Sequence, residues 1–207
     1  MNRSPIVAVA SSAGDLEAVS ELLFVLPAAC GQAFVIVQHL DSARREPPLA
    51  EALAKRMKLP VIEAHDGVVP ERGHVYVLSA NTTLTIIDGR ISVTPGAKGP
   101  LRPGDTLLIS LAEACGESAI GVVLSGGGSD GALGIQAIKK GGGATFAQYP
   151  GSARFPSMPI SAIETKCVDL VLRPKEIGRE LTRLSLPRAS SGTVARRVPL
   201  TAVSGAW

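Results

Sequence analysis

The chain has 207 residues and a formal net charge of +3, with 45% apolar and 19% charged residues. This balance excludes a disordered chain and allows one large domain with a buried core. Aromatic residues make up only 3% and basic residues are scattered, which argues against a nucleic-acid partner. No apolar run reaches the ~18–20 residues that span a bilayer, so we expect no membrane insertion. Cys30, Cys115 and Cys167 lack metal-ligand spacing, which indicates reduced thiols in a cytoplasmic protein without a metal site.

Short apolar runs alternate with helical patterns through the first 63 residues. The predicted strands are Pro5–Ala10, Ala33–Val37 and Leu59–Glu63. The predicted helices are Asp15–Leu26 and a second one that begins at Pro47-Pro48 and has Leu49, Leu53 and Met57 as its apolar stripe. This rhythm indicates right-handed crossovers and a parallel sheet that is covered on both faces.

The middle of the chain departs from this rhythm and then returns to it. His74–Leu78 and Leu84–Ile87 alternate, and an Asp88-Gly89 turn leads into Ile91–Val93, which predicts a small antiparallel hairpin excursion. After a Gly- and Pro-rich loop, the expected elements are a helix at Asp105–Cys115, a strand at Ala119–Leu124, a helix at Gly131–Lys140, a strand at Ala144–Ala147, a helix near Ile160–Thr165, a strand at Val168–Leu172 and a helix at Lys175–Leu184. The predicted fold class is α/β, with a doubly wound, mainly parallel sheet and helices on both faces.

Reactive side chains follow three predicted strands, at the edge where open α/β sheets bind their ligands. The first strand runs into Ser11-Ser12-Ala13-Gly14 and then into a helix. This pattern resembles a nucleophile elbow, a sharp turn that needs small neighbours and exposes the serine oxygen, with Ala10 in place of its first glycine. The alternative is that a serine here only caps the helix.

The second strand is followed by Gln38-His39-Leu40. A serine nucleophile needs a base at ordinary pH, and imidazole has a suitable pKa for that role. Of the other histidines, His65 lies in a polar loop and His74 within an alternating strand, so His39 is the better candidate. The alternative is a histidine with a purely structural role in the core.

The third strand leads into a glycine-rich segment, Ser125–Gly131, that opens a helix. Its small residues allow the backbone to approach a ligand closely. Asp130 within it can hold a histidine tautomer, or it can simply cap the helix. A glycine-rich turn before a helix can also bind phosphate, which leaves nucleotide binding as a further alternative, although neither the dinucleotide nor the Walker spacing is present.

Together these segments resemble the catalytic domain of the chemotaxis protein-glutamate methylesterases, the CheB type, over about Ile6 to Leu184. The family's G-A-S-T-G-G motif corresponds to Ala10–Asp15, and its Q-H pair to Gln38-His39. The other matches are Leu124–Gly131 for the L-[ST]-G-x-G-x-D-G segment, and Ala147-Gln148, Met158-Pro159 and Ala162-Ile163 for the late A-Q, G-M-P and A-I pattern. Ser110–Glu113 and Ala119–Gly131 are most similar to methylesterase domains that are fused to a methyltransferase.

The resemblance implies a serine hydrolase with Ser12 as nucleophile, His39 as base and Asp130 as the residue that orients the base. It places the oxyanion and substrate-binding positions at Ala13, Gly126, Gly127 and Met158. Family members remove methyl groups from glutamate methyl esters on receptor signalling helices, and some deamidate glutamines there. The implied partners are therefore methylated helices of chemoreceptors or sensor proteins, and no metal or cofactor is required.

Several positions depart from the family pattern around the nucleophile. Ala10 and Asp15 replace glycines, Ala13 replaces a threonine, and Gly127 stands where many members carry methionine. Leu101 stands near the place of a family histidine or arginine. These differences bear on substrate binding and rate rather than on the triad. They leave the alternative of a catalytically weakened regulatory module that docks on a receptor or sensor kinase.

The resemblance also predicts the domain organisation. Residues 1–186 would form a stand-alone catalytic domain, without the phospho-receiver domain that controls the regular enzymes. Residues 187–207 have no hydrophobic period and would form a mobile tail. A separate regulator would then replace the receiver domain.

Overall fold

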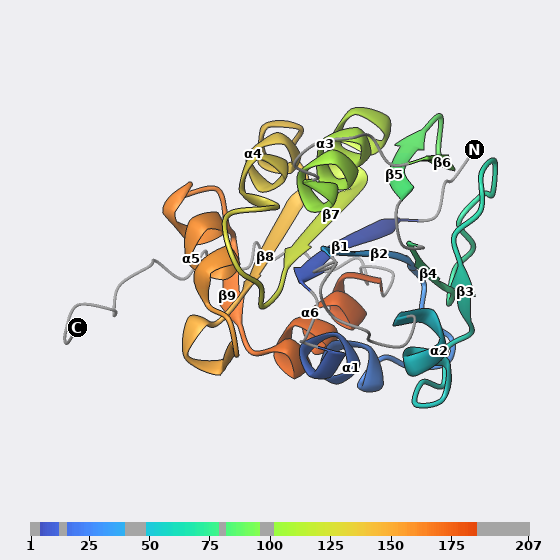
Figure 1. Ribbon diagram of the computed structural model, residues 1–207, viewed down its shortest axis with the longest axis horizontal. Helices are drawn as coiled ribbons and strands as arrows, with labels where there is room; N and C mark the ends of the chain where they lie inside the picture. Colours follow the sequence, from blue (N-terminus) through green and yellow to red (C-terminus); the bar gives the residue numbers. More distant parts are fainter. Residues whose placement is uncertain (1–4, 13–15, 40–48, 79–81, 96–101, 186–207) are drawn as a thin grey trace, which may run out of the picture.

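The computed structural model describes residues 5–12, 16–39, 49–78, 82–95 and 102–185. Within them, a seven-stranded sheet has the order β3-β4-β2-β1-β7-β8-β9, and every neighbouring pair is parallel. Its strands are β1 (Ile6–Ser12), β2 (Ala33–His39), β3 (Val61–Glu63), β4 (Val75–Val77), β7 (Ala119–Val123), β8 (Ala144–Gln148) and β9 (Leu170–Leu172). The chain first adds strands on one side of β1 and then continues from β7 on the other, which makes the sheet doubly wound (Figure 1).

Helices cover both faces of this sheet, as the sequence predicted (Figure 1). One face carries α1 (Leu16–Phe24), α2 (Leu49–Ala54) and α6 (Pro174–Ser185). The other carries α3 (Pro103–Cys115), α4 (Ala132–Lys140) and α5 (Ser157–Glu164). Two single 3₁₀ turns, Gly116–Ser118 and Pro150–Ser152, join α3 to β7 and follow β8. Within the described residues, no helix is long and apolar enough to cross a membrane.

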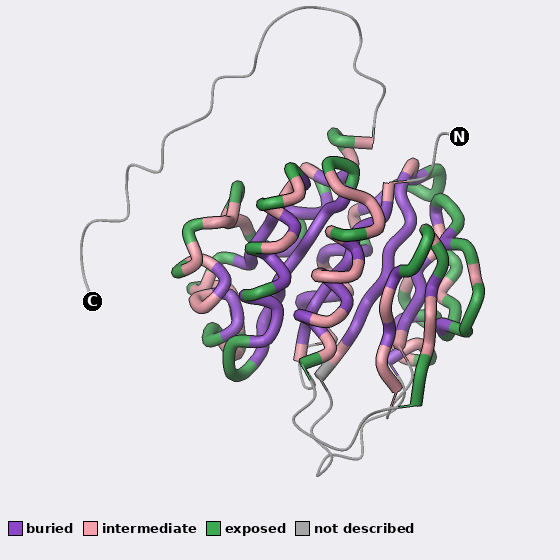
Figure 2. Tube along the Cα trace, turned by 90° about the horizontal axis from the view of Figure 1, so that it is seen from above, coloured by how far each residue is buried: buried purple, intermediate pink, exposed green. Residues whose placement is uncertain are grey.

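The two faces of β1 supply two separate hydrophobic cores. Ala8 and Ala10 pack against α3, α4 and α5, whereas Val7 and Val9 pack against α1, α2 and α6. This is the two-residue alternation of a strand that is buried on both sides, and it explains why the run looks continuously apolar. Figure 2 shows the buried stretches concentrated in the strands between the helical layers. By the same alternation, Ser12 faces the α3 side of the sheet.

The predicted hairpin is confirmed, and it is formed by β5 (Thr82–Ile87) and β6 (Arg90–Pro95). Its turn residues Asp88 and Gly89 have φ values of 52° and 77°, which suits a tight two-residue hairpin turn. The segment before it differs from expectation. The expected His74–Leu78 strand is β4, which belongs to the parallel sheet and has all three residues buried because it lies between β2 and β3.

Helix boundaries differ from expectation mainly at prolines. Helix α3 begins at Pro103, two residues before the predicted start, and α5 begins at Ser157 rather than near Ile160. Proline fits the first turn of a helix because its missing N–H has no partner there in any case. The predicted helix start at Pro47-Pro48 lies outside the described residues, as does the predicted tail, and the domain limits of 1–186 and 187–207 stay a prediction.

Candidate active site

Three chain segments that sequence analysis singled out meet at the carboxyl edge of the sheet, where β1 adjoins both β2 and β7. Ser12 ends β1, and its Cα is paired in register with that of His39, which ends β2. The Ser12 N–H donates to the carbonyl of Ser125 at 3.2 Å, and Gln38 Nε2 donates to the Ser12 carbonyl at 3.1 Å. The junction between β1 and β7 is also where the strand order reverses, the usual ligand site of a doubly wound sheet. The side chain of His39 and all of Ala13 lie outside the described residues.

Asp130 is buried beside the amino end of α3. Its Oδ2 accepts the Gly104 N–H and its Oδ1 accepts the Asp105 N–H, both at 2.9 Å. Sequence analysis considered that Asp130 caps the helix that follows it, but α4 begins after Gly131, at φ 90°, without any side-chain cap. Asp130 therefore caps the neighbouring helix α3.

Gly104 shows how closely Asp130 approaches β1. A Cβ on Gly104 would lie 2.8 Å from the Ala10 Cβ and 3.0 Å from Asp130 Oδ2. Ala10 is two residues before Ser12 and shares its face of β1, so the carboxylate of Asp130 lies on the same side of the sheet as Ser12. The extra methyl group of Ala10, relative to the family's glycine, is accommodated because Gly104 has no side chain.

Gly126 and Met158 lie directly behind Ser12. A Cβ on Gly126 would lie 2.0 Å from Met158 Sδ and 2.8 Å from the Ser12 Cβ, so only glycine fits there. The Gly126 N–H donates to the Phe155 carbonyl and its carbonyl accepts the Met158 N–H, each at 2.9 Å. Met158 is 0% exposed. In this structure both residues support the loop from inside, and the substrate contact expected of them stays a prediction.

Among the predicted oxyanion and substrate-binding positions that the structure describes, Gly127 is the exposed one. Nothing lies within 4 Å of the position that a Cβ would take on Gly127. The loop around it is exposed from Gly127 to Ser129. The space that many family members fill with a methionine side chain is therefore open here.

Arg102 and Asp105 are site residues that sequence analysis missed. Asp105 is 4% exposed, and its Oδ1 accepts the Gly134 N–H at 2.9 Å. Arg102 Nε lies 2.8 Å from Asp105 Oδ2, and Arg102 Nη2 donates to the Ser129 carbonyl at 2.7 Å. Burial raises the pKa of the Asp105 carboxyl, and the nearby charge of Asp130 adds to the effect. The Arg-x-x-Asp spacing at a helix start is the sequence signal that could have found this pair.

The two other histidines lie away from Ser12. His74 precedes β4 and so lies at the amino edge of the sheet, where its Nδ1 is 3.0 Å from the Arg72 carbonyl. His65 follows the carboxyl end of β3, contrary to the expectation that only His39 follows a strand in this way. His65 is exposed, however, and β4 and β2 separate its strand from β1.

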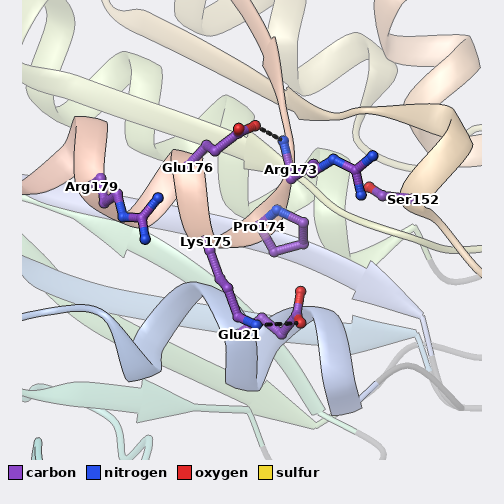
Figure 3. Close-up of a pocket in the computed structure, with 7 residues that line it drawn as sticks. All are labelled: Glu21, Ser152, Arg173, Pro174, Lys175, Glu176 and Arg179. Carbon is purple, nitrogen blue, oxygen red and sulfur yellow. Dashed lines mark hydrogen bonds and ion pairs between the residues drawn. The ribbon is translucent and has the colours of Figure 1, made fainter.

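A pocket of about 220 Å³ lies near the amino end of α6, and none of the three predicted triad residues lines it. Its lining residues are Glu21, Ser152, Arg173, Pro174, Lys175, Glu176 and Arg179 (Figure 3). Lys175 Nζ pairs with Glu21 Oε1 at 3.0 Å, and Glu176 accepts the Arg173 N–H at 2.9 Å. The pocket thus contains the Lys175–Glu21 ion pair, and its lining has three basic and two acidic side chains.

The sequence profile of CheB methylesterase matches residues 7–181, which is most of the chain. The chain belongs to the CheB methylesterase family. The crystal structure of the Thermotoga maritima CheB methylesterase catalytic domain superposes with a TM-score of 0.76 at 29% identity, covering 87% of this chain and 98% of that one. The doubly wound fold with its antiparallel hairpin is thus the fold of that catalytic domain.

The chain is also similar to proteins that are named as protein-glutamate methylesterases. A Myxococcus xanthus protein-glutamate methylesterase/protein-glutamine glutaminase is 36% identical over 168 residues, which cover 81% of this chain and 47% of the relative. An Anaeromyxobacter dehalogenans protein of the same name is 38% identical over 86% of this chain and 53% of its own length. This chain spans about half the length of these relatives. A Leptospira interrogans protein that carries the name provisionally is 36% identical over 89% of this chain and 96% of its own.

Proposed function

We propose that this chain is a serine hydrolase that removes methyl groups from glutamate methyl esters on the cytoplasmic signalling helices of chemoreceptors or sensor proteins. The observation that carries the proposal is the meeting of Ser12 and the Ser125–Asp130 segment at the β1–β7 junction, with His39 in register beside Ser12. The names of the relatives support both the ester substrate and glutamine deamidation as a second activity.

The proposed reaction is an acyl transfer in two steps. His39 takes the Ser12 hydroxyl proton while Oγ attacks the γ-carbonyl of the glutamyl ester, and Asp130 orients the imidazole. N–H groups at Ala13 and Gly127 hold the tetrahedral oxyanion until methanol leaves with the proton from His39. Water then attacks the acyl-enzyme with the help of His39, which releases the glutamate carboxylate and regenerates Ser12.

Methanol release from methylated receptor membranes tests the proposal. We expect the Ser12→Ala variant to lose turnover almost completely. Ser11→Ala is a matched control, because Ser11 is the adjacent residue of β1 but its hydroxyl is buried without a hydrogen-bond partner in the described structure. Methanol release that persists in Ser12→Ala would disprove the mechanism. A folded wild-type chain that binds the receptor but releases no methanol would favour the regulatory docking module.

A further inference from the structure

We propose that Arg102 and Asp105 are positioning residues that hold Asp130 in the geometry needed to orient the base. The proposal deepens the proposed function, since it rests on the role of Asp130 in the same site. It concerns a cluster in which the amino ends of two helices, α3 and α4, face one another with a carboxylate from each side between them.

The cluster consists of two reciprocal caps. Asp130, which precedes α4, accepts the N–H groups of Gly104 and Asp105 in the first turn of α3. Asp105 of α3 in turn accepts the Gly134 N–H in the first turn of α4. Each helix therefore fixes the carboxylate that caps the other, and a shift of one cap displaces its counterpart.

Arg102 links the two halves of this cluster. Its guanidinium reaches Asp105 Oδ2 through Nε and the Ser129 carbonyl through Nη2. Ser129 immediately precedes Asp130, so the contact restrains the backbone from which the Asp130 side chain extends. Asp105 Oδ2 has no hydrogen bond of good geometry within the described residues, which leaves the charge of Arg102 as its nearest compensation.

These contacts indicate that Arg102 and Asp105 position Asp130 and do not bind the substrate. Asp105 is buried, and both carboxylate oxygens of Asp130 accept hydrogen bonds from backbone N–H groups of α3. Loss of the Arg102–Asp105 pair would let the Asp130 carboxylate rotate, while the start of the loop at Ser125 and Gly126 stays held by backbone hydrogen bonds to Ser12, Phe155 and Met158. The pair should therefore act on turnover and not on substrate affinity.

A double-mutant cycle with Asp130 tests this role. We expect Arg102→Gln and Asp105→Asn each to lower kcat for methyl-ester hydrolysis by about 10- to 100-fold, with KM within about twofold. In an Asp130→Asn background the same substitutions should lower kcat by less than about twofold, because the carboxylate through which both residues act is already absent. Arg183→Gln is the matched control, since it removes another Arg–carboxylate pair at i,i+3 spacing, with Glu180 on α6.

Amide NMR gives a readout that needs no activity. In ¹⁵N-labelled protein, Arg102→Gln should move the Gly104 and Asp105 amide signals and speed their hydrogen exchange, whereas Arg183→Gln should leave both unchanged. Unchanged signals, a kcat within twofold of wild type, or an equal loss with and without Asp130 would each overturn the positioning role. If the wild type releases no methanol, the proposed function fails on that result, and the amide signals alone decide the role of the pair.

Discussion

Asp105 is a buried acid whose charge opposes folding. Its carboxyl is almost fully buried, and that burial raises its pKa above the ordinary value. A carboxyl with a raised folded-state pKa contributes stability that is complete below the unfolded pKa of about 3.9 and is lost as pH rises through the folded pKa. The wild type should therefore lose stability relative to Asp105→Asn as the pH rises above about 4. Urea unfolding of both proteins across this range measures the difference.

The sign of the difference in unfolding free energy between wild type and Asp105→Asn shows whether lower turnover in the variant comes from lower stability. The side-chain amide oxygen that Asp105→Asn introduces can still accept the Gly134 N–H, so at pH 7 the variant should be at least as stable as the wild type although its turnover is lower. Glu51→Gln is a control in which the stability difference should have the opposite sign. A hydrogen bond from Lys55 lowers the pKa of exposed Glu51, so the wild type should gain stability relative to this variant as pH rises. A variant at Asp105 that becomes less stable relative to wild type as pH rises would contradict this assignment.

Gly127 offers a substitution that adds a family feature to the exposed loop. The position of its Cβ is open and its φ lies outside the positive range, so a side chain fits without strain. Gly127→Met should leave the unfolding free energy within about 0.5 kcal/mol of wild type, as for other surface changes. We expect a lower KM for the methylated receptor, because an apolar side chain on the rim adds contact area. Steady-state methanol release measures KM. An unchanged or higher KM would show that a methionine side chain at position 127 adds no useful contact with the receptor.

The residues of the site were predictable to different degrees. Ser12, His39 and Asp130 could be found because each follows a buried strand, and the carboxyl ends of parallel strands share one edge. Arg102 and Asp105 were not found, because their importance depends on the meeting of two helix ends that are 25 or more residues apart in sequence. Met158 was placed on the substrate side by its motif, but only the tertiary contact with Gly126 shows that its side chain is buried.

At the scale of elements, the contact between α3 and α4 depends on Gly134. A Cβ on this residue would lie 2.4 Å from the Leu108 Cβ and 2.8 Å from its Cδ1, so the two helices approach closely only because the side chain is missing. Gly134→Ala should lower the unfolding free energy by about 1–3 kcal/mol despite the better helix propensity of alanine. It should also lower kcat, because the Gly134 N–H is the group that Asp105 caps. Chemical denaturation and methanol release measure the two effects.

Gly127→Ala provides the control for this substitution. It makes the same chemical change at a site with no neighbour within 4 Å of the new methyl group. It should be neutral or stabilising by about 0.4–1 kcal/mol through the unfolded chain. Equal effects at positions 127 and 134 would show that helix approach does not limit stability here.

Most elements were predictable because their hydrophobic patterns agree with their burial. The strands β1, β2 and β7 each contain a continuous run of apolar residues and glycine, as expected for a sheet with both faces covered. The pattern failed at β4, whose alternating neighbours His74 and Leu78 suggested an antiparallel strand. Strand partners depend on the order of the whole sheet, and a three-residue strand carries too little pattern to specify them.

For the molecule as a whole, the two hydrophobic cores should unfold together. Leu22 of α1 lies in one core and Leu111 of α3 in the other, and both side chains are buried. The cores share one sheet, since successive residues of β1 point alternately into each, so neither can open without exposing the strands that support the other. Leu22→Ala and Leu111→Ala should each cost about 2–5 kcal/mol and preserve a single unfolding transition.

Native-state hydrogen exchange distinguishes this from two independent layers. In either variant, the slowest amides of β1, α3 and α1 should lose protection by the same free energy, because they exchange only through global unfolding. Leu133→Ala on the outer face of α4 is the control: its side chain is 50% exposed, and it should change stability by less than about 0.5 kcal/mol. If Leu111→Ala lowered protection in α3 while the amides of α1 kept theirs, the layer that holds Asp130 would open separately. The active-site geometry would then depend on local rather than global stability.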